Sequence, residues 1–275
     1  MPSLLAKQYH SITIGDKNTW DDWHLIPTSR PRFSPPEANI MLVDVPGANG
    51  SLNLSKVMTG YTTYKNRTGG FEFIVHPDFV GYDKNRETGV HYWHSWSEAY
   101  HTIMAYLHGE ERHAILNDDP TYYYDCVWTV NEWNSGTKWS TITLNYSAQP
   151  FKKSVQNMKE PWLWDPFSFV DGYINDFQEI GPGSTGTDVK PFIPLFINGS
   201  LELNLVCGDE PVIPVFNMGS IVQDMTVSLN NGTAYPLAEN SSNKFRKIKM
   251  VGPTNTLRFA GSGTLNDIDY VAGWF

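Results

Sequence analysis

The side chains best suited to chemistry lie in the first half of the sequence. All eight histidines occur at or before His113, and His91, His94, His101 and His108 crowd one predicted helix. Histidines grouped in this way can bind zinc when a third and a fourth ligand are suitably spaced. Here His101 and His108 share the polar face of the helix, and no cysteine or second acidic ligand lies at a suitable spacing. The sequence therefore predicts no metal ligand.

Other motifs are equally unsuited to catalysis. The run from Gly181 to Gly186 matches the GxGxxG dinucleotide pattern, but Pro191 and Pro194 would break the helix that this pattern requires. The carboxylate pairs Asp21-Asp22 and Asp118-Asp119 occur in turn-like settings, where aspartate is common for backbone reasons. A nucleophile elbow and a Walker loop are both absent from the sequence. We expect no catalytic residue and no cofactor, and therefore a protein that is not an enzyme.

Aromatic residues are the one chemically suggestive excess. The sequence has 10 Trp and 14 Tyr, and Trp20, Trp23, Trp133 and Trp139 fall in predicted loops. Exposed rings stack on sugars, but aromatic rings also dominate protein cores and interfaces. We favour a core or interface role and keep a sugar-binding platform as the alternative.

Composition and charge narrow the class of protein. The 275 residues are 40% hydrophobic and 18% charged, with 22 Gly and 18 Pro, which is typical of a turn-rich, β-dominated globular chain. The net charge of −9 argues against binding to nucleic acid. Cys126 and Cys207 are too few for a disulfide framework, so we expect two reduced, packed thiols. No apolar run is long enough to span a membrane, so we expect no membrane insertion and folding in a cytosol.

Hydrophobic periodicity predicts the elements of residues 1–150. We expect one helix from Trp96 to His108, with Ser95 and Glu98 as a capping box and Gly109 as the C-terminal cap. Strand patterns are the other signal, and the long irregular stretch from Trp20 to Pro36 should run extended over a surface because of its prolines. The predicted strands are Ser11–Ile14, a buried Ile40–Val45, a buried Phe71–Val75, and a hairpin over Val127–Tyr146.

The second half shows strand patterns only. A polar stretch after Gln149 marks the best boundary, so we predict two domains, 1–150 and 151–275. The first is predicted to be a β-sandwich with one helix and a hairpin, and the second a β-sandwich, which makes the fold class mainly β. Predicted strands cover 201–205 and 225–229, the latter before an Asn230-Asn231-Gly232 turn, with shorter strands around 257–259 and 268–270.

Several runs of residues resemble one known family. Val45 to Ser55, then Thr59-Gly60 and Tyr64 to Phe71, resemble the N-terminal domain of bacteriophage distal tail proteins. Asp119 to Tyr124 and Ala148 to Lys152 are similar to later parts of that domain. Three further runs resemble the galectin-like C-terminal domain of the family: Gly208 to Pro214, Phe245-Arg246, and Leu257 to Gly263.

The resemblance implies a structural role in a siphophage-type virion. Members of the family form a hexameric ring at the distal end of the tail, between the tail tube and the tip or baseplate that attaches to the host. The implied partners are further copies of the chain, the tail tube protein, a tail-associated tip protein and receptor-binding proteins. The ring would be assembled in the host bacterial cytoplasm. The main alternative is a carbohydrate-binding β-sandwich module that contacts the host surface, and a tail hydrolase is a weaker one.

The proline-rich stretch is the predicted subunit interface. We expect 29–39 to cross to a neighbouring subunit, where arginines can pair with an acidic partner and prolines keep the strand pre-extended. The last strand could belong to the second domain or return to the first. The interface residues predicted in this way are Arg30, Arg32, Phe33, Pro35 and Pro36.

Overall fold

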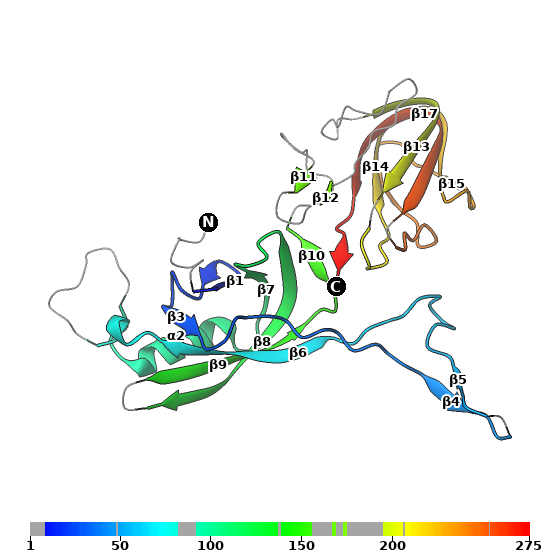
Figure 1. Cartoon of the computed structure of the whole chain (residues 1–275). Helices are drawn as coiled ribbons and strands as arrows, with labels where there is room; N and C mark the ends of the chain where they lie inside the picture. The colour runs from blue at the N-terminus through cyan, green and yellow to red at the C-terminus, as the bar shows by residue number, and fades with distance from the viewer. Residues whose placement is uncertain are drawn as a thin grey trace. The chain divides into compact units, whose positions relative to one another are not determined.

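The computed structural model divides the chain into two compact units, Met1–Lys152 together with Phe275, and Lys153–Trp274. It describes residues 9–47, 49–81, 92–136, 139–155, 167–168, 173–174, 195–205, 207–252 and 254–275. His91 and the glycine run from Gly181 to Gly186 lie outside these ranges. Antiparallel strands dominate both units (Figure 1), so the predicted mainly β fold class is confirmed.

The first unit is built on one antiparallel sheet. Its strands follow the order β2-β1-β7-β8-β9-β6-β3, and a separate pair, β4 and β5, lies beyond it. The short strand β10 (Lys152–Ser154) lies off this path and pairs with β8, and a 3₁₀ turn, η1 (Pro77–Phe79), follows β6. The bounds are β1 Ile12–Ile14, β2 Lys17–Asn18, β3 Leu25–Pro27, β4 Leu42–Asp44, β5 Ser51–Asn53, β6 Arg67–Val75, β7 Glu111–Leu116, β8 Tyr122–Ser135 and β9 Ser140–Ala148.

Strict alternation explains the central hairpin of this sheet. Along β9, every second side chain is buried and the others are half-buried, as the period of a strand requires. Ile142, Leu144 and Tyr146 face the core together, and β9 pairs with β8 on one side and with β6 on the other. The predicted hairpin is confirmed, although β8 begins at Tyr122 rather than at Val127.

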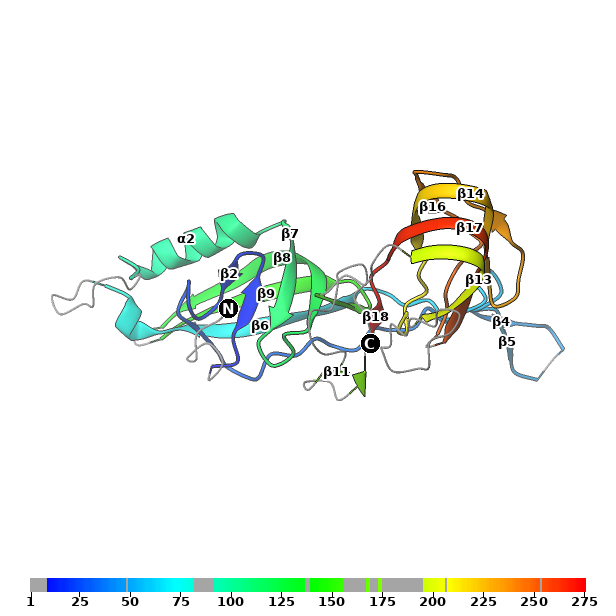
Figure 2. The ribbon, with the colours of Figure 1, turned by 90° about the horizontal axis from the view of Figure 1, so that it is seen from above.

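The helix α2 (Trp96–Leu107) packs one face onto the sheet (Figure 2) and is the only α-helix in the described ranges. Ala99, Ile103 and Leu107 are buried on that face. The Ser95 hydroxyl accepts the backbone N–H of Glu98 at 3.2 Å, and Gly109 adopts a φ of 82° after the last turn. These contacts confirm the predicted helix and both of its caps. No helix in the described ranges is long and apolar enough to cross a membrane.

Replacing Ser95 with alanine should lower the free energy of unfolding by about 1 kcal/mol, because the first turn would lose its side-chain acceptor. Ser97→Ala, in the same turn and also exposed but not at the N-cap, is the control and should change little, since alanine has the higher helix propensity. Denaturant unfolding of both variants measures the difference. Equal effects would mean that Ser95 does not act as a cap.

The prediction of a buried strand over Ile40–Val45 is wrong. Only Leu42–Asp44 forms a strand, β4, and it pairs with β5 alone, in a hairpin whose strand residues are all exposed. An apolar run indicates that a segment is buried, but it does not indicate whether the burying residues belong to the same chain. Here none of the described residues buries the run.

The second unit consists of strands only within its described ranges. A sheet of order β13-β17-β14-β15, with β16 also paired to β14, curls around one core. Asn230 and Asn231 both have positive φ, 48° and 57°, which confirms the predicted turn after β14. The bounds are β11 Phe167–Ser168, β12 Tyr173–Ile174, β13 Leu195–Leu205, β14 Val215–Leu229, β15 Tyr235–Pro236, β16 Ser242–Lys244, β17 Asn255–Asp269 and β18 Gly273–Trp274.

The two short strands predicted near the end are one long strand. β17 runs through Gly261 and Gly263, opposite a part of β14 where the register shifts repeatedly. A Cβ on Gly261 would lie 2.1 Å from the backbone oxygen of Asp224, so only glycine allows this approach. The glycine thus lets the strand bend and continue.

Each unit encloses one cysteine. Cys126 lies in the core of the first unit and Cys207 in that of the second, and both thiols are free. Burial raises the pKa of both thiols, which disfavours the reactive thiolate. The expectation of packed, reduced cysteines is therefore confirmed.

Candidate assembly surface

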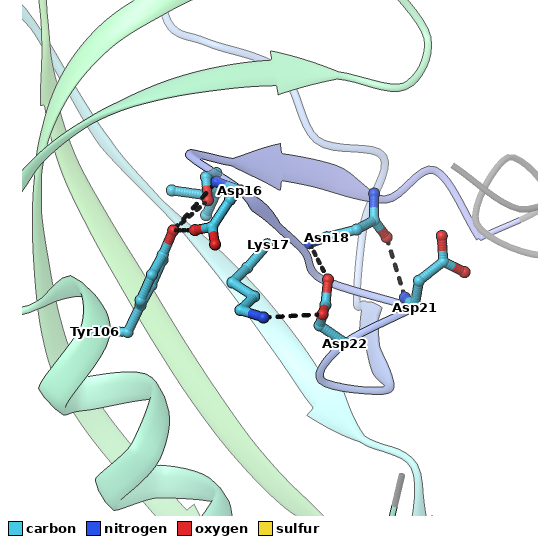
Figure 3. Close-up of polar contacts among 7 residues, drawn as sticks. Asp16, Lys17, Asn18, Asp21, Asp22 and Tyr106 are labelled. Carbon is cyan, nitrogen blue, oxygen red and sulfur yellow. Dashed lines mark hydrogen bonds and ion pairs between the residues drawn. The ribbon is translucent and has the colours of Figure 1, made fainter. Parts of the chain in front are cut away.

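The carboxylates near the N-terminal hairpin hold a turn. In the pair Asp21-Asp22, the second carboxylate accepts the backbone N–H of Asn18 at 2.7 Å and lies 3.4 Å from the ammonium of Lys17 (Figure 3). Nearby, the Asp16 carboxylate accepts the hydroxyl of Tyr106, which joins this turn to α2 and lowers the pKa of Asp16. These interactions are structural, as the turn setting of the sequence indicated.

The histidines of the helix do not converge. His94 pairs with Glu98 at 2.9 Å, whereas His101 is exposed on the outer face. The Nδ1 atom of His108 accepts the backbone N–H of Val130 in β8 at 3.2 Å, so this histidine satisfies a backbone donor of that strand. Among the described residues, no three His, Cys, Asp or Glu side chains gather as a metal site requires. The structure thus offers no metal-binding geometry in these ranges.

The aromatic residues mostly serve the core. Trp20 and Trp23 are buried, and the half-buried Trp133 packs on Tyr100 with ring centroids 4.8 Å apart. Of the tryptophans predicted to lie in loops, only Trp139 is largely exposed, at 55%. A single exposed ring is a poor platform for a sugar chain, so these residues favour the core and interface interpretation.

The pair Asp118-Asp119 links three segments that are distant in sequence. Asp118 accepts Nε–H of Arg30 at 2.6 Å and pairs with Nδ1 of His10 at 2.8 Å. Asp119 binds the ammonium of Lys152 at 2.8 Å. Burial alone would raise the pKa of Asp118, but the bonds from His10 and Arg30 outweigh it and lower the pKa. The pair therefore ties down the start of the proline-rich stretch and the exit of the first unit.

The predicted interface residues divide into two groups. Arg32 and Pro35 are exposed and Pro36 is half-buried, so these three are accessible to a partner. Arg30 is exposed but already paired with Asp118, and Phe33 is only 8% exposed. That Arg32, Pro35 and Pro36 contact a neighbouring subunit stays a prediction.

Phe33 fills an aromatic socket on its own unit. Its ring centroid lies 3.9 Å from that of Tyr124, 4.6 Å from that of Tyr146 and 5.3 Å from that of Phe71. The stretch around Phe33 is therefore anchored to the sheet in the isolated chain. Sequence reasoning did not predict this anchor, because an aromatic residue between prolines fits a core and an interface equally well.

Beyond this anchor the chain forms a feature that we call the projecting hairpin, residues 37–65. Its root is a short ribbon: Lys65 donates its backbone N–H to Glu37 at 2.8 Å, and Asn39 donates to Thr63 at 2.8 Å. Its far part carries β4 and β5, well away from the sheet (Figure 1).

The projecting hairpin exposes an unusual amount of apolar surface. Met58 is 97% exposed and Val57 71%, although soluble proteins seldom leave so many large apolar side chains together in water. Such a surface is typical of a protein contact. The exposed apolar side chains are Ile40, Met41, Leu42, Val43, Val45, Leu52, Val57 and Met58.

The fold, a β-rich chain of two units with one helix on the first sheet and a hairpin reaching beyond it, is similar to that of a solved phage protein. The chain superposes on the crystal structure of the SPP1 Dit (gp 19.1) protein with a TM-score of 0.50. The match covers 96% of this chain and 99% of that one, at 11% sequence identity.

That protein is described as a paradigm of the hub adsorption apparatus in phages that infect Gram-positive bacteria. At this identity the similarity shows the fold, and at that level it supports the distal tail resemblance seen in the sequence. No family model matches the sequence, and no curated protein matches it.

Proposed function

We propose that this protein is a structural, non-enzymatic subunit of a phage tail, whose copies close into a hexameric ring at the distal end of the virion. The ring would join the tail tube protein to the tip or baseplate, including a tail-associated tip protein and receptor-binding proteins. The observation that carries the proposal is the projecting hairpin, whose apolar side chains have no cover from the described residues. The shared hub fold supports it.

The two units divide the labour in this proposal. Residues 1–150 make the ring, because this part carries the projecting hairpin and the accessible residues Arg32 and Pro35. Residues 151–275 form a galectin-like domain that presents surfaces to other tip proteins. A contact between unlike surfaces of identical copies closes into a ring when the rotation between neighbours is fixed. The hairpin of one copy resting on the next copy is such a contact.

Three serine substitutions in the projecting hairpin test the proposal. Burial of a large apolar side chain is worth about 1.5 kcal/mol or more, so Ile40→Ser, Leu42→Ser and Met58→Ser together should weaken association by roughly a thousandfold or more. Stability of the isolated chain should barely change, because all three side chains are exposed. Light scattering and negative-stain images of the purified protein give the measurement.

The matched control removes exposed apolar side chains elsewhere. Phe196 and Val222 are 64% and 73% exposed in the second unit, and serine at both positions should leave the rings intact. Rings that survive the triple change would show that the hairpin is not the contact. A wild-type protein that stays monomeric at all concentrations would rule out the ring itself.

A further inference from the structure

Arg67, the first residue of β6, carries a buried positive charge. Its side chain is only 5% exposed, and no carboxylate pairs with it among the residues that the structure describes. Burial lowers the pKa of Arg67, and its Nη2 atom is buried without a hydrogen-bond partner. A buried, unpaired guanidinium is unfavourable, so the bonds that it does make require an explanation.

Those bonds join two segments that are far apart in sequence. The Nε–H of Arg67 donates to the backbone oxygen of Pro150 at 2.8 Å, and Nη1–H donates to that of Ser34 at 3.0 Å. The guanidinium carbon lies 5.4 Å from the centre of the Tyr124 ring. Ser34 leads into the projecting hairpin, and Pro150 leads out of the first unit. An apolar side chain at position 67 would have no donor for either carbonyl.

Ser34 is also held from two other directions. Its backbone N–H donates to the Tyr146 hydroxyl at 3.0 Å, and its own hydroxyl donates to the backbone oxygen of Thr68 at 2.9 Å. A Cβ on Gly69 would lie 2.5 Å from the Tyr146 hydroxyl, so a glycine is what lets this hydroxyl reach across β6. All the polar groups of Ser34 are thus engaged, just before the hairpin begins.

The outgoing side of the projecting hairpin is held at the same place. The Tyr64 ring lies 5.7 Å from the ring of Phe151 and 4.8 Å from that of Phe275, and both of these residues belong with the first unit or its exit. Lys65 then bonds to Glu37 across the root. Both strands of the root are therefore fastened beside the guanidinium of Arg67.

We propose that Arg67 is a positioning residue for assembly: its guanidinium fixes the direction of the projecting hairpin and ties that direction to the segment leaving the first unit. This inference rests on the proposed ring. A ring closes only when each contact repeats at the same angle, so a hairpin with a loose root would meet its neighbour at many angles. Holding both carbonyls with one rigid, planar group removes that freedom.

Two variants of Arg67 and one control separate this role from simple stability. Arg67→Met removes the charge and the donors but keeps an unbranched side chain, and replacing a buried charge by an apolar group is often tolerated. Arg67→Lys keeps the charge and can reach one carbonyl, so it should rescue in part. The control is Arg112→Met on β7, because Arg112 is half-buried and likewise donates to a backbone oxygen, that of Tyr106, at 2.9 Å.

The first measurement is amide hydrogen exchange at Asn39 and Lys65, the two donors of the root. It is made in protein that also carries Ile40→Ser, Leu42→Ser and Met58→Ser, so that association between copies does not change the exchange rates of these amides. Exchange at both amides should rise roughly tenfold or more in Arg67→Met, less in Arg67→Lys, and not at all in Arg112→Met. Amides of β9 should keep their protection in every variant.

The second measurement is ring formation by the same substitutions in the otherwise wild-type chain. Arg67→Met should lose rings, Arg67→Lys should form fewer, and Arg112→Met should match the wild type. Unchanged exchange at the root, or a loosened root with normal rings, would overturn the proposal. If Arg67→Met fails to fold, Arg67→Lys is measured in its place. Unchanged amide exchange at the root in Arg67→Lys would then overturn the proposal. A wild type without rings would refute the proposed function, while exchange alone would still show whether Arg67 holds the hairpin.

Discussion

Replacing Phe33 with alanine should lower the free energy of unfolding by about 3–5 kcal/mol, the range typical of removing a buried aromatic ring. The ring is 8% exposed and contacts Tyr124, Tyr146 and Phe71, so its loss leaves a cavity that rigid aromatic neighbours cannot easily fill. Denaturant unfolding measures the change. Arg32→Ala, next to it but exposed, is the control and should shift stability by no more than about 0.5 kcal/mol.

The same pair of variants tests the predicted interface when it is measured at several protein concentrations. If Phe33 serves its own unit, as its contacts indicate, the loss of stability does not depend on concentration. If the stretch instead crosses to a neighbour in the ring, the loss grows as concentration rises, because association then contributes to stability. An effect of Arg32→Ala confined to ring formation would support the interface role of that residue.

A second large effect is expected at Gly261, where alanine should destabilise the second unit by about 3 kcal/mol or more. The residue has a φ of 121°, which an alanine adopts only with strain, and its Cβ would lie 2.1 Å from the backbone oxygen of Asp224. Either β17 or β14 must move, because the backbone of Asp224 and Met225 lies against Gly261. The strand pairing should therefore fail locally.

Gly199 provides a matched control for Gly261. The two glycines are directly paired between β13 and β17, and Gly199 also has a positive φ, 97°, but a Cβ there would meet nothing within 4 Å. Gly199→Ala should therefore cost only the backbone strain, about 1–2 kcal/mol. Hydrogen exchange within β13 and β17 measures both variants. Equal losses would show that the close approach to Asp224 is unimportant.

Local signals account for much of the architecture. The helix could be placed from Ser95, Glu98 and Gly109, because caps are recognised by neighbours along the chain. The alternation over Ser140–Ala148 predicted a strand with one buried face, since side chains in a strand alternate between faces. The asparagine pair at Asn230 predicted its turn for the same local reason. None of these features depends on residues distant in sequence.

The candidate site was only partly predictable. The sequence predicted an interface in the proline-rich stretch, which stays a prediction, whereas the exposed apolar surface lies further along, from Ile40 to Met58. A run such as Ile40–Val45 has the same pattern whether its own chain or another chain covers it. A signal was present in the prolines before this run and the glycines after it, which isolate it from the sheet strands. That signal predicts a loop or hairpin, but it does not predict that the apolar side chains of the run are exposed.

By itself, the sequence determined the mainly β composition, the capped helix from Trp96, the hairpins and the absence of a recognisable catalytic motif. These depend on residue type and on spacing over a few positions. Only the tertiary structure decided that Phe33 packs on its own sheet, that β17 continues through Gly261, and that Arg67 joins Ser34 to Pro150. Each of these is a contact between segments distant in sequence, where burial and hydrogen bonding depend on which partner the fold brings near.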